Sequence, residues 1–255
     1  MILAIDAGNS SITFGTVEGG QIRGVFRIHT DLSYTPEEYG IKLKQLMDFY
    51  EIDVHGFEGA ILSSVVPPVT RALSTAVKNL IGTECMLVGP GIKTGMNVRI
   101  DDPGTLAADL AVGSIAAISC YGTPAIVIEM GTATTMVVVD EKACYRGGAI
   151  MPGIRLGLKA LASDTSLLPE ISITAPKKVI ATNTVDAMRS GAVLATAAMI
   201  DGMIERMETE LGKRCSIIAT GELAGAIAPC CKRSITVDDD LILKGLWTIW
   251  EKNRK

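Results

Sequence analysis

The chain has 255 residues, of which 48% are hydrophobic and 4% aromatic, so its core must be built mainly from aliphatic side chains. Its formal net charge of −4 argues against nucleic-acid binding, which normally needs a basic patch. The apolar start soon reaches Asp6, and the Ala-rich stretch near 107–118 contains Asp109, so we expect neither a signal peptide nor a membrane span. The cysteines form no CxxC pair and have no histidine partner at ligand spacing, which favours free thiols and a cytoplasmic protein.

The first half of the chain begins with a predicted β-meander. Residues 4–28 contain three short apolar runs separated by turn signals, a pattern typical of consecutive hairpins. Apolar residues then recur at helical spacing. The elements expected after the meander are, in chain order, a helix near 39–50, a strand at 59–62, a helix entered through Pro67-Pro68, a strand at 85–88 and a helix over 105–119.

The second half repeats this plan. Residues 127–151 echo residues 4–28, and a gapless alignment pairs Asp6 with Glu129, Gly8 with Gly131, Asn9 with Thr132 and Ser11 with Thr134. The elements expected next are helices near 153–161 and 183–211, a strand at 215–219, a helix, a short strand and a helix at 240–250. The duplication predicts an α/β architecture with domains at 1–120 and 121–255.

Each copy ends an apolar strand in an acid and follows it with a turn of glycine and small polar residues. Such a turn presents N–H and O–H donors in one concavity, which binds anions, and glycine lets phosphates approach the backbone. The acid can hold a cation directly or through water. Two ordinary hairpins with capped turns are the alternative, but the repetition favours a nucleotide triphosphate site.

The paired turns resemble the phosphate motifs of the superfamily that contains actin, sugar kinases and heat-shock chaperone ATPases. In those proteins two tandem ribonuclease-H-like domains, with mixed sheets flanked by helices, close over ATP. The segment ATGELA (219–224) is similar to their adenosine motif. A finer resemblance, to type III pantothenate kinases, extends over essentially the whole chain. It is carried by DAGNSSITFG (6–15), SSVVPP (63–68), GPGIKTGM (89–96), DPGTLAADL (102–110), GTATT (131–135), GGAIMPGI (147–154), NTVDAMRSGAV (183–193) and DDLILKGL (239–246).

The resemblance implies transfer of the γ-phosphoryl group of ATP to the primary hydroxyl of pantothenate, the first step toward coenzyme A. Asp109 occupies the general-base position, Asp6 also serves a Mg²⁺ site, and Thr132 contacts ATP from the second turn. The residues that would cradle the phosphates are Asp6, Ala7, Gly8, Asn9, Ser10, Ser11, Ile12 and Thr13.

The resemblance also implies a pantothenate site, a monovalent cation and a homodimer. The substrate positions are Ile100, Ala107, Ala108, Asp109, Leu110 and Thr184. Thr184 would come from the neighbouring subunit, and the helix after it, rich in small residues and Met, fits either a dimer face or core. Glu129 stands where K⁺ or NH₄⁺ is held. Neither a nucleic acid nor a membrane is implied as a partner.

Three residues depart from the family pattern. The family usually has Arg where Leu110 stands, often has Tyr at Ile100, and has Asp at Glu129. Leu cannot replace the hydrogen bonds of Arg, and sites built around polar groups tolerate such exchanges badly. The hypotheses that follow are a pantothenate kinase with a rearranged pocket, a kinase for another small hydroxy acid or amide, and a non-catalytic ATP-binding regulator.

Overall fold

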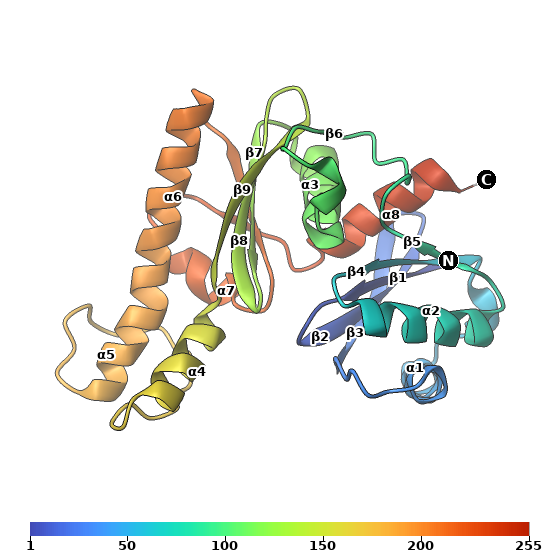
Figure 1. Ribbon diagram of the computed structural model, residues 1–255, viewed down its shortest axis with the longest axis horizontal. Helices are drawn as coiled ribbons and strands as arrows, with labels where there is room; N and C mark the ends of the chain where they lie inside the picture. Colours follow the sequence, from blue (N-terminus) through green and yellow to red (C-terminus); the bar gives the residue numbers. More distant parts are fainter. Residues whose placement is uncertain (255) are drawn as a thin grey trace. The chain divides into compact units, whose positions relative to one another are not determined.

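The computed structural model describes residues 1–254, which form two compact α/β units (Figure 1). The first unit contains residues 1–95, 102–119 and 240–254, and the second contains 96–101 and 120–239. Each unit has its own sheet and its own hydrophobic core. The predicted duplication of an α/β unit is therefore confirmed.

The sheet of the first unit has the strand order β3-β2-β1-β4-β5. Its strands are β1 (Ile2–Ala7), β2 (Ser11–Glu18), β3 (Gln21–His29), β4 (Gly59–Ser64) and β5 (Cys85–Leu87). β1, β2 and β3 form the predicted antiparallel meander, whereas β4 runs parallel to β1 and β5 parallel to β4. This order and these directions define a ribonuclease-H-like sheet.

Helices α1 (Pro36–Phe49) and α2 (Pro67–Ile81) supply the main core of this unit. α1 begins with a capping box, in which Thr35 Oγ1 accepts from the N–H of Glu38 and the Glu38 carboxylate accepts from the N–H of Thr35. Its buried face joins α2 and the strand residues Leu3 and Ile5 in one apolar cluster. Gly82, at φ +76°, ends α2 in the left-handed conformation that glycine favours.

The opposite face of this sheet is covered by α8 (Leu241–Asn253), which lies on β1 and β4. Glycines make room for it: a Cβ on Gly15 would lie 2.6 Å from Leu243, and one on Gly59 would lie 2.2 Å from Trp250. A Cβ on Gly245 would lie 2.3 Å from the Val112 carbonyl of α3 (Ala108–Tyr121), so α8 also packs closely against α3.

This packing changes the domain division expected from the sequence. A cut at residue 120 assigns the last helix to the second half, but the structure groups it with the first unit because its apolar face lies on β1 and β4. Residues 96–101, which the cut at 120 assigns to the first half, belong to the second unit, because β6 (Asn97–Val98) pairs with β9 (Cys144–Pro152).

The sheet of the second unit has the order β11-β10-β7-β8-β9-β6. The strands not yet given are β7 (Ala125–Met130), β8 (Ala133–Val139), β10 (Ser216–Thr220) and β11 (Thr236–Val237). β7, β8 and β9 form an antiparallel meander, and β10 runs parallel to β7. The second sheet thus repeats the first and adds β6 at one edge.

The helices of the second unit follow the predicted order with one difference. They are α4 (Ile154–Asp164), α5 (Thr184–Ser190), α6 (Thr196–Leu211) and α7 (Ala224–Ile227). The helix expected over 183–211 is interrupted by a π-helical turn at Gly191–Ala195, so α5 and α6 are separate elements. Among residues 1–254, no helix combines the length and the apolar character needed to cross a bilayer.

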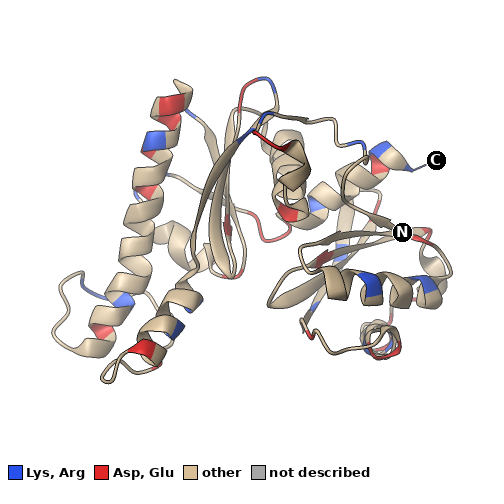
Figure 2. Cartoon of the chain, in the orientation of Figure 1, with Lys and Arg blue, Asp and Glu red and all other residues tan. Residues whose placement is uncertain are grey.

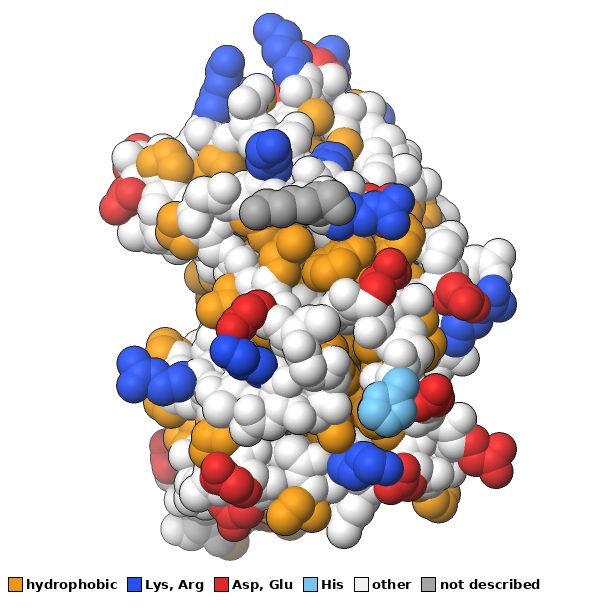
Figure 3. Space-filling model, turned by 90° about the vertical axis from the view of Figure 1, so that its right-hand side faces the viewer, with side chains coloured by type: hydrophobic (Ala, Val, Ile, Leu, Met, Phe, Trp, Pro, Cys, Tyr) orange, Lys and Arg blue, Asp and Glu red, His pale blue; other side chains and the backbone are white. Residues whose placement is uncertain are grey.

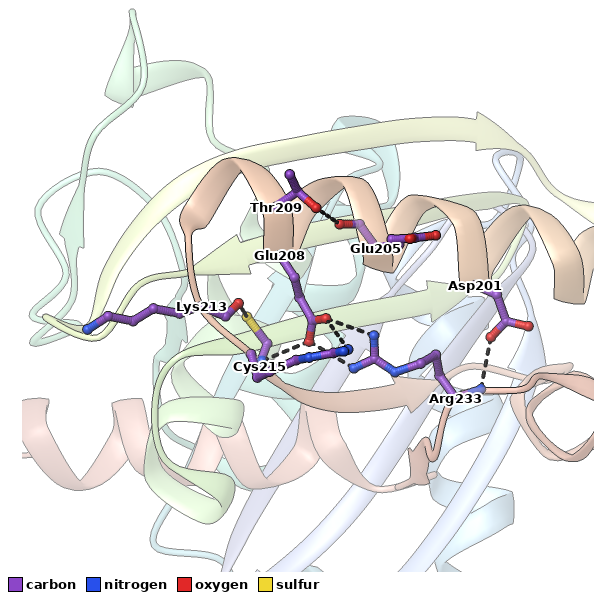
Figure 4. Close-up of polar contacts among 8 residues, drawn as sticks. Asp201, Glu205, Glu208, Thr209, Lys213, Cys215 and Arg233 are labelled. Carbon is purple, nitrogen blue, oxygen red and sulfur yellow. Dashed lines mark hydrogen bonds and ion pairs between the residues drawn. The ribbon is translucent and has the colours of Figure 1, made fainter.

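A charged cluster fixes the end of α6 to the start of β10 (Figure 4). Glu208, with only 6% of its side chain exposed, accepts two bonds from Arg233, of 2.7 and 2.8 Å, and one from Arg214 of 2.9 Å. It also accepts from the backbone N–H of Cys215 at 2.9 Å. The hydrogen bonds from Arg233, helped by the other donors, lower the pKa of Glu208 to about 2.

Charged side chains are mostly carried by helices and loops, and the strands of both sheets carry few (Figure 2). On the face drawn in Figure 3, acidic and basic side chains are interspersed rather than gathered into a field of one sign. Asp6 and Glu129 are the charged residues of β1 and β7, which are interior strands of the two sheets.

Candidate active site

The turn between β1 and β2 exposes the polar residues Asn9, Ser10 and Ser11. Its backbone is closed by a 3.0 Å bond from Gly8 N to Ser11 O. Thr30, just after β3, holds the turn from the side: its N–H donates to Ser10 O at 3.1 Å and its hydroxyl donates to Gly8 O at 2.6 Å. Thr30 was not predicted as a site residue, because its contact depends on where β3 ends.

A line of polar side chains crosses the first sheet beside this turn. The strand register places Asp6 opposite Thr13 on β2 and Ser63 on β4, and places Thr13 opposite Arg27 on β3. Residues directly opposite in neighbouring strands point to the same face of a sheet. We call Arg27, Thr13, Asp6 and Ser63 the first polar row. Arg27 Nε donates to Thr13 Oγ1 at 3.2 Å.

Asp109, in the first turn of α3, belongs to the same unit and acts electrostatically on Asp6. Burial raises the pKa of Asp6 to about 7, and the charge of Asp109 adds to this, while Ser63 and Arg27 oppose it. Burial also raises the pKa of Asp109, whose Oδ1 accepts from Leu110 N at 2.7 Å. The structure thus brings together two carboxyl groups that a cation would stabilise. The flanking residues Ala107, Ala108 and Leu110 are partly buried.

The residues around Asp6 fit a nucleotide-bound Mg²⁺ better than a metal held by protein alone. Within residues 1–254, no three His, Cys, Asp or Glu side chains converge as a ligand set. Mg²⁺ typically takes one or two carboxylates and completes its shell with water and substrate phosphates. The buried hydroxyl of Ser63 has no hydrogen-bond partner in the described residues, so a polar group is available beside Asp6.

The second turn, between β7 and β8, is built in the same way but is one residue shorter. Gly131 N donates to Ala133 O at 3.0 Å, two residues further along the chain. The matching bond in the first turn joins Gly8 N to Ser11 O, three residues further along. Glu129 lies opposite Thr135 on β8 and Thr220 on β10. We call Thr135, Glu129 and Thr220 the second polar row. Thr135 therefore matches Thr13, and the pairing of Ser11 with Thr134 in the gapless alignment is wrong.

Two glycines, Gly153 and Gly221, allow the start of α4 and the 219–224 segment to pack closely against the second turn. A Cβ on Gly153, at the start of α4, would lie 2.3 Å from Thr132 O, and Gly153 N donates to that oxygen at 3.1 Å. A Cβ on Gly221, at φ +97°, would lie 2.7 Å from Met130 O. The second turn, the start of α4 and the 219–224 segment are thereby joined, and an ion pair from Arg155 to Glu222 links the latter two. The side chain of Thr132 remains exposed.

The remaining predicted substrate residues lie in the second unit. Ile100 follows β6 and lies beside Gly147, where a Cβ would be 3.7 Å from its Cγ2. Thr184 is exposed at the start of α5, which Asn183 caps through a bond from Asp186 N. The predicted positions at 107–110 belong instead to the first unit.

Tandem ribonuclease-H-like sheets, each with a carboxylate at the end of its first strand and a small polar turn after it, define an actin-like ATPase fold. Solved structures agree. One is a Sinorhizobium meliloti protein described as a putative 2-dehydro-3-deoxygalactonokinase, with a TM-score of 0.61 and 12% identity, covering 100% of this chain and 97% of that one. Another is a Campylobacter jejuni protein described as a conserved putative Baf family transcriptional activator, with a TM-score of 0.62, 18% identity and 98% of both chains covered.

The sequence comparisons go further than the fold. The family model described as type III pantothenate kinase matches residues 2–206, and the chain belongs to this family. A type III pantothenate kinase of Moorella thermoacetica is 38% identical over 99% of this chain and 100% of its own length. One from an Exiguobacterium species is 40% identical over 100% of both chains. The predicted resemblance is confirmed.

Proposed function

We propose that the protein transfers the γ-phosphoryl group of ATP to the primary hydroxyl of pantothenate, giving 4′-phosphopantothenate and ADP. Membership of the family and the full-length relatives named as pantothenate kinases support this reaction. The structural observation that carries it is the placement of Asp6, near the end of β1, and Asp109, in the first turn of α3, in one compact unit and near enough for their charges to interact.

ATP binds through both turns in this proposal. The exposed turn between Asp6 and Thr13 contacts the phosphates through backbone N–H groups and hydroxyls, and Thr132 contacts them from the second turn. The 219–224 segment, fixed against Met130 by Gly221, receives the adenosine. Asp6 holds Mg²⁺ directly or through water. When bound, this ion neutralises charge on the phosphates, which phosphoryl transfer requires.

Asp109 is the general base of the proposal. It accepts the proton of the pantothenate hydroxyl while the oxygen bonds to the γ-phosphorus and the bond to ADP breaks. Burial raises its pKa above that of a free carboxyl, which makes it a better proton acceptor than an exposed aspartate. Its position in the first turn of a helix fixes it to a rigid element.

Glu129 holds a monovalent cation, K⁺ or NH₄⁺, in this proposal. Its neighbours in the second polar row, Thr135 and Thr220, supply oxygen atoms on the same face of the sheet. Thr135 Oγ1 is buried and has no hydrogen-bond partner in residues 1–254, which fits a site that gains a ligand. Glu keeps the charge that Asp has in relatives, on a side chain one methylene longer.

A homodimer formed through the second unit is also proposed. The end of α4 and the loop that leads to α5 expose large apolar side chains that water disfavours, namely Leu161 (43%), Leu167 (88%), Val179 (72%) and Ile180 (84%). Thr184 follows this segment directly, so an interface here would carry it toward the partner's site. We place the enzyme in the cytoplasm, where its free cysteines remain reduced.

Leu110 and Ile100 favour a second candidate, a kinase for another small hydroxy acid or amide. Both are apolar and partly buried at positions where the family pattern has hydrogen-bond donors. Purified protein incubated with ATP, Mg²⁺, K⁺ and pantothenate should give phosphopantothenate detectable by mass spectrometry. A parallel set of small hydroxy acids and amides distinguishes the candidates. Product from one of these and none from pantothenate would establish the second candidate.

A further inference from the structure

Ser63 lies next to the proposed metal site and has no part in the function described so far. It is the next-to-last residue of β4, within the SSVVPP segment, and its side chain is completely buried. Its Oγ has no hydrogen-bond partner among residues 1–254. A buried hydroxyl without a partner costs stability, so its retention calls for an explanation from a bound state.

The register of the sheet gives Ser63 a defined neighbour. It is directly opposite Asp6, and both side chains point to the face covered by α8, because Gly15 and Gly59 on that face meet Leu243 and Trp250. The other hydroxyl beside Asp6 belongs to Thr13, which accepts a bond from Arg27 and keeps its own proton to donate. Ser63 differs from Thr13 in being completely buried and in having no other hydrogen-bond partner in the described residues.

The second unit has a related feature on a different strand. Thr135 is directly opposite Glu129, and its Oγ1 is likewise buried without a partner in the described residues. Thr135 corresponds to Thr13, whereas the counterpart of Ser63 on the parallel neighbouring strand is Thr220. Both units thus place a buried hydroxyl without a partner beside the acid of the first strand, although the strand that carries it differs.

We propose that Ser63 is a positioning residue of the metal–nucleotide site, whose hydroxyl donates to the ionised Asp6 carboxylate and orients it toward the cation. An ionised carboxylate accepts only, so a neighbouring O–H fixes one of its oxygens and leaves the other for the metal. The inference rests on the proposed binding of ATP with Mg²⁺ at Asp6.

The test is a titration of the ADP-loaded protein with Mn²⁺, followed by electron paramagnetic resonance, which needs no turnover. Ser63→Ala should weaken Mn²⁺ binding by about tenfold or more, the usual cost of removing such a supporting group. Ser63→Thr, which keeps the hydroxyl, should stay near wild type. Thr16→Val is the matched control, since it removes a buried hydroxyl from the opposite face of the same sheet.

An unchanged Mn²⁺ affinity in Ser63→Ala, or an equal loss in Thr16→Val, would overturn the inference. Thermal melting checks that each variant is folded. If Ser63→Ala is not, Ser63→Cys fills the same space with a weak donor and must show the same loss. Failure of the proposed function is separate: wild type that binds Mn²⁺ and ADP but makes no phosphopantothenate refutes only the reaction. Wild type that binds no Mn²⁺ refutes the role of Ser63.

Discussion

Asp6 of β1 and Asp109 of α3 lie close enough in the first unit for the charge of Asp109 to raise the pKa of Asp6. Burial raises the pKa of both groups. A cation placed at this pair would relieve their repulsion and stabilise both ionised forms. The pair therefore links the metal site and the proposed base within one compact unit.

Substituting Gly153 tests the close packing behind the second turn. Gly153→Ala places a methyl group 2.3 Å from Thr132 O, so we expect a loss of about 1–3 kcal/mol in stability and weaker nucleotide binding. Gly157→Ala is the control in the next turn of α4, where the added methyl group meets nothing within 4 Å. It should be neutral or stabilising by up to about 1 kcal/mol. Chemical denaturation and nucleotide titration measure both; equal effects in the two variants would contradict the account.

Glu208 provides a prediction about pH. Its pKa is about 2 in the folded protein against 4.5 for an unperturbed glutamate, so its stabilisation is present above pH 4.5 and is lost as pH falls toward 2. Glu208→Gln should lower the free energy of unfolding by about 2–4 kcal/mol at pH 7, and by progressively less between pH 4.5 and 2. Glu205→Gln, on the exposed side of α6, should change it by less than about 0.5 kcal/mol. A pH-independent difference for Glu208→Gln would refute the role of its charge.

Several features of the fold could be predicted because they depend on local pattern. The two meanders were predicted from short apolar runs separated by Gly-containing turns, the helix near 39–50 from its apolar periodicity, and the next helix from Pro67-Pro68 at its start. The position of α8 could not be predicted, because it depends on the space left by Gly15 and Gly59 in strands far away in sequence. The short second turn was missed because a gapless alignment hides a one-residue difference.

The candidate site was predicted from motif positions alone. Motif positions indicated Asp6, Asp109 and Thr132, but not how their side chains are supported. Ser63 and Arg27 belong to the first polar row only through the strand register, which no single segment specifies. Thr30 joins the site through two contacts to the first turn, which likewise depend on the register of β3.

Leu110→Arg tests whether the substrate pocket has only been weakened. Arg restores a multiple hydrogen-bond donor next to Asp109, so the KM for pantothenate should fall by about tenfold or more if the substrate lies there. Leu110→Met is the control for side-chain length without charge and should leave KM nearly unchanged. Steady-state kinetics at saturating ATP provide the measurement. A KM that rises or stays constant in Leu110→Arg would show that the pocket is shaped for another acceptor.

The central claim is that Asp109 removes the proton from the acceptor hydroxyl. The most direct measurement compares phosphopantothenate formation and ATP binding in wild type and Asp109→Asn, which keeps the size of the side chain and removes its basicity. The account predicts that kcat falls by about 10²–10⁴-fold while ATP affinity changes little. Turnover close to that of wild type in Asp109→Asn would contradict it and would remove Asp109 from the mechanism.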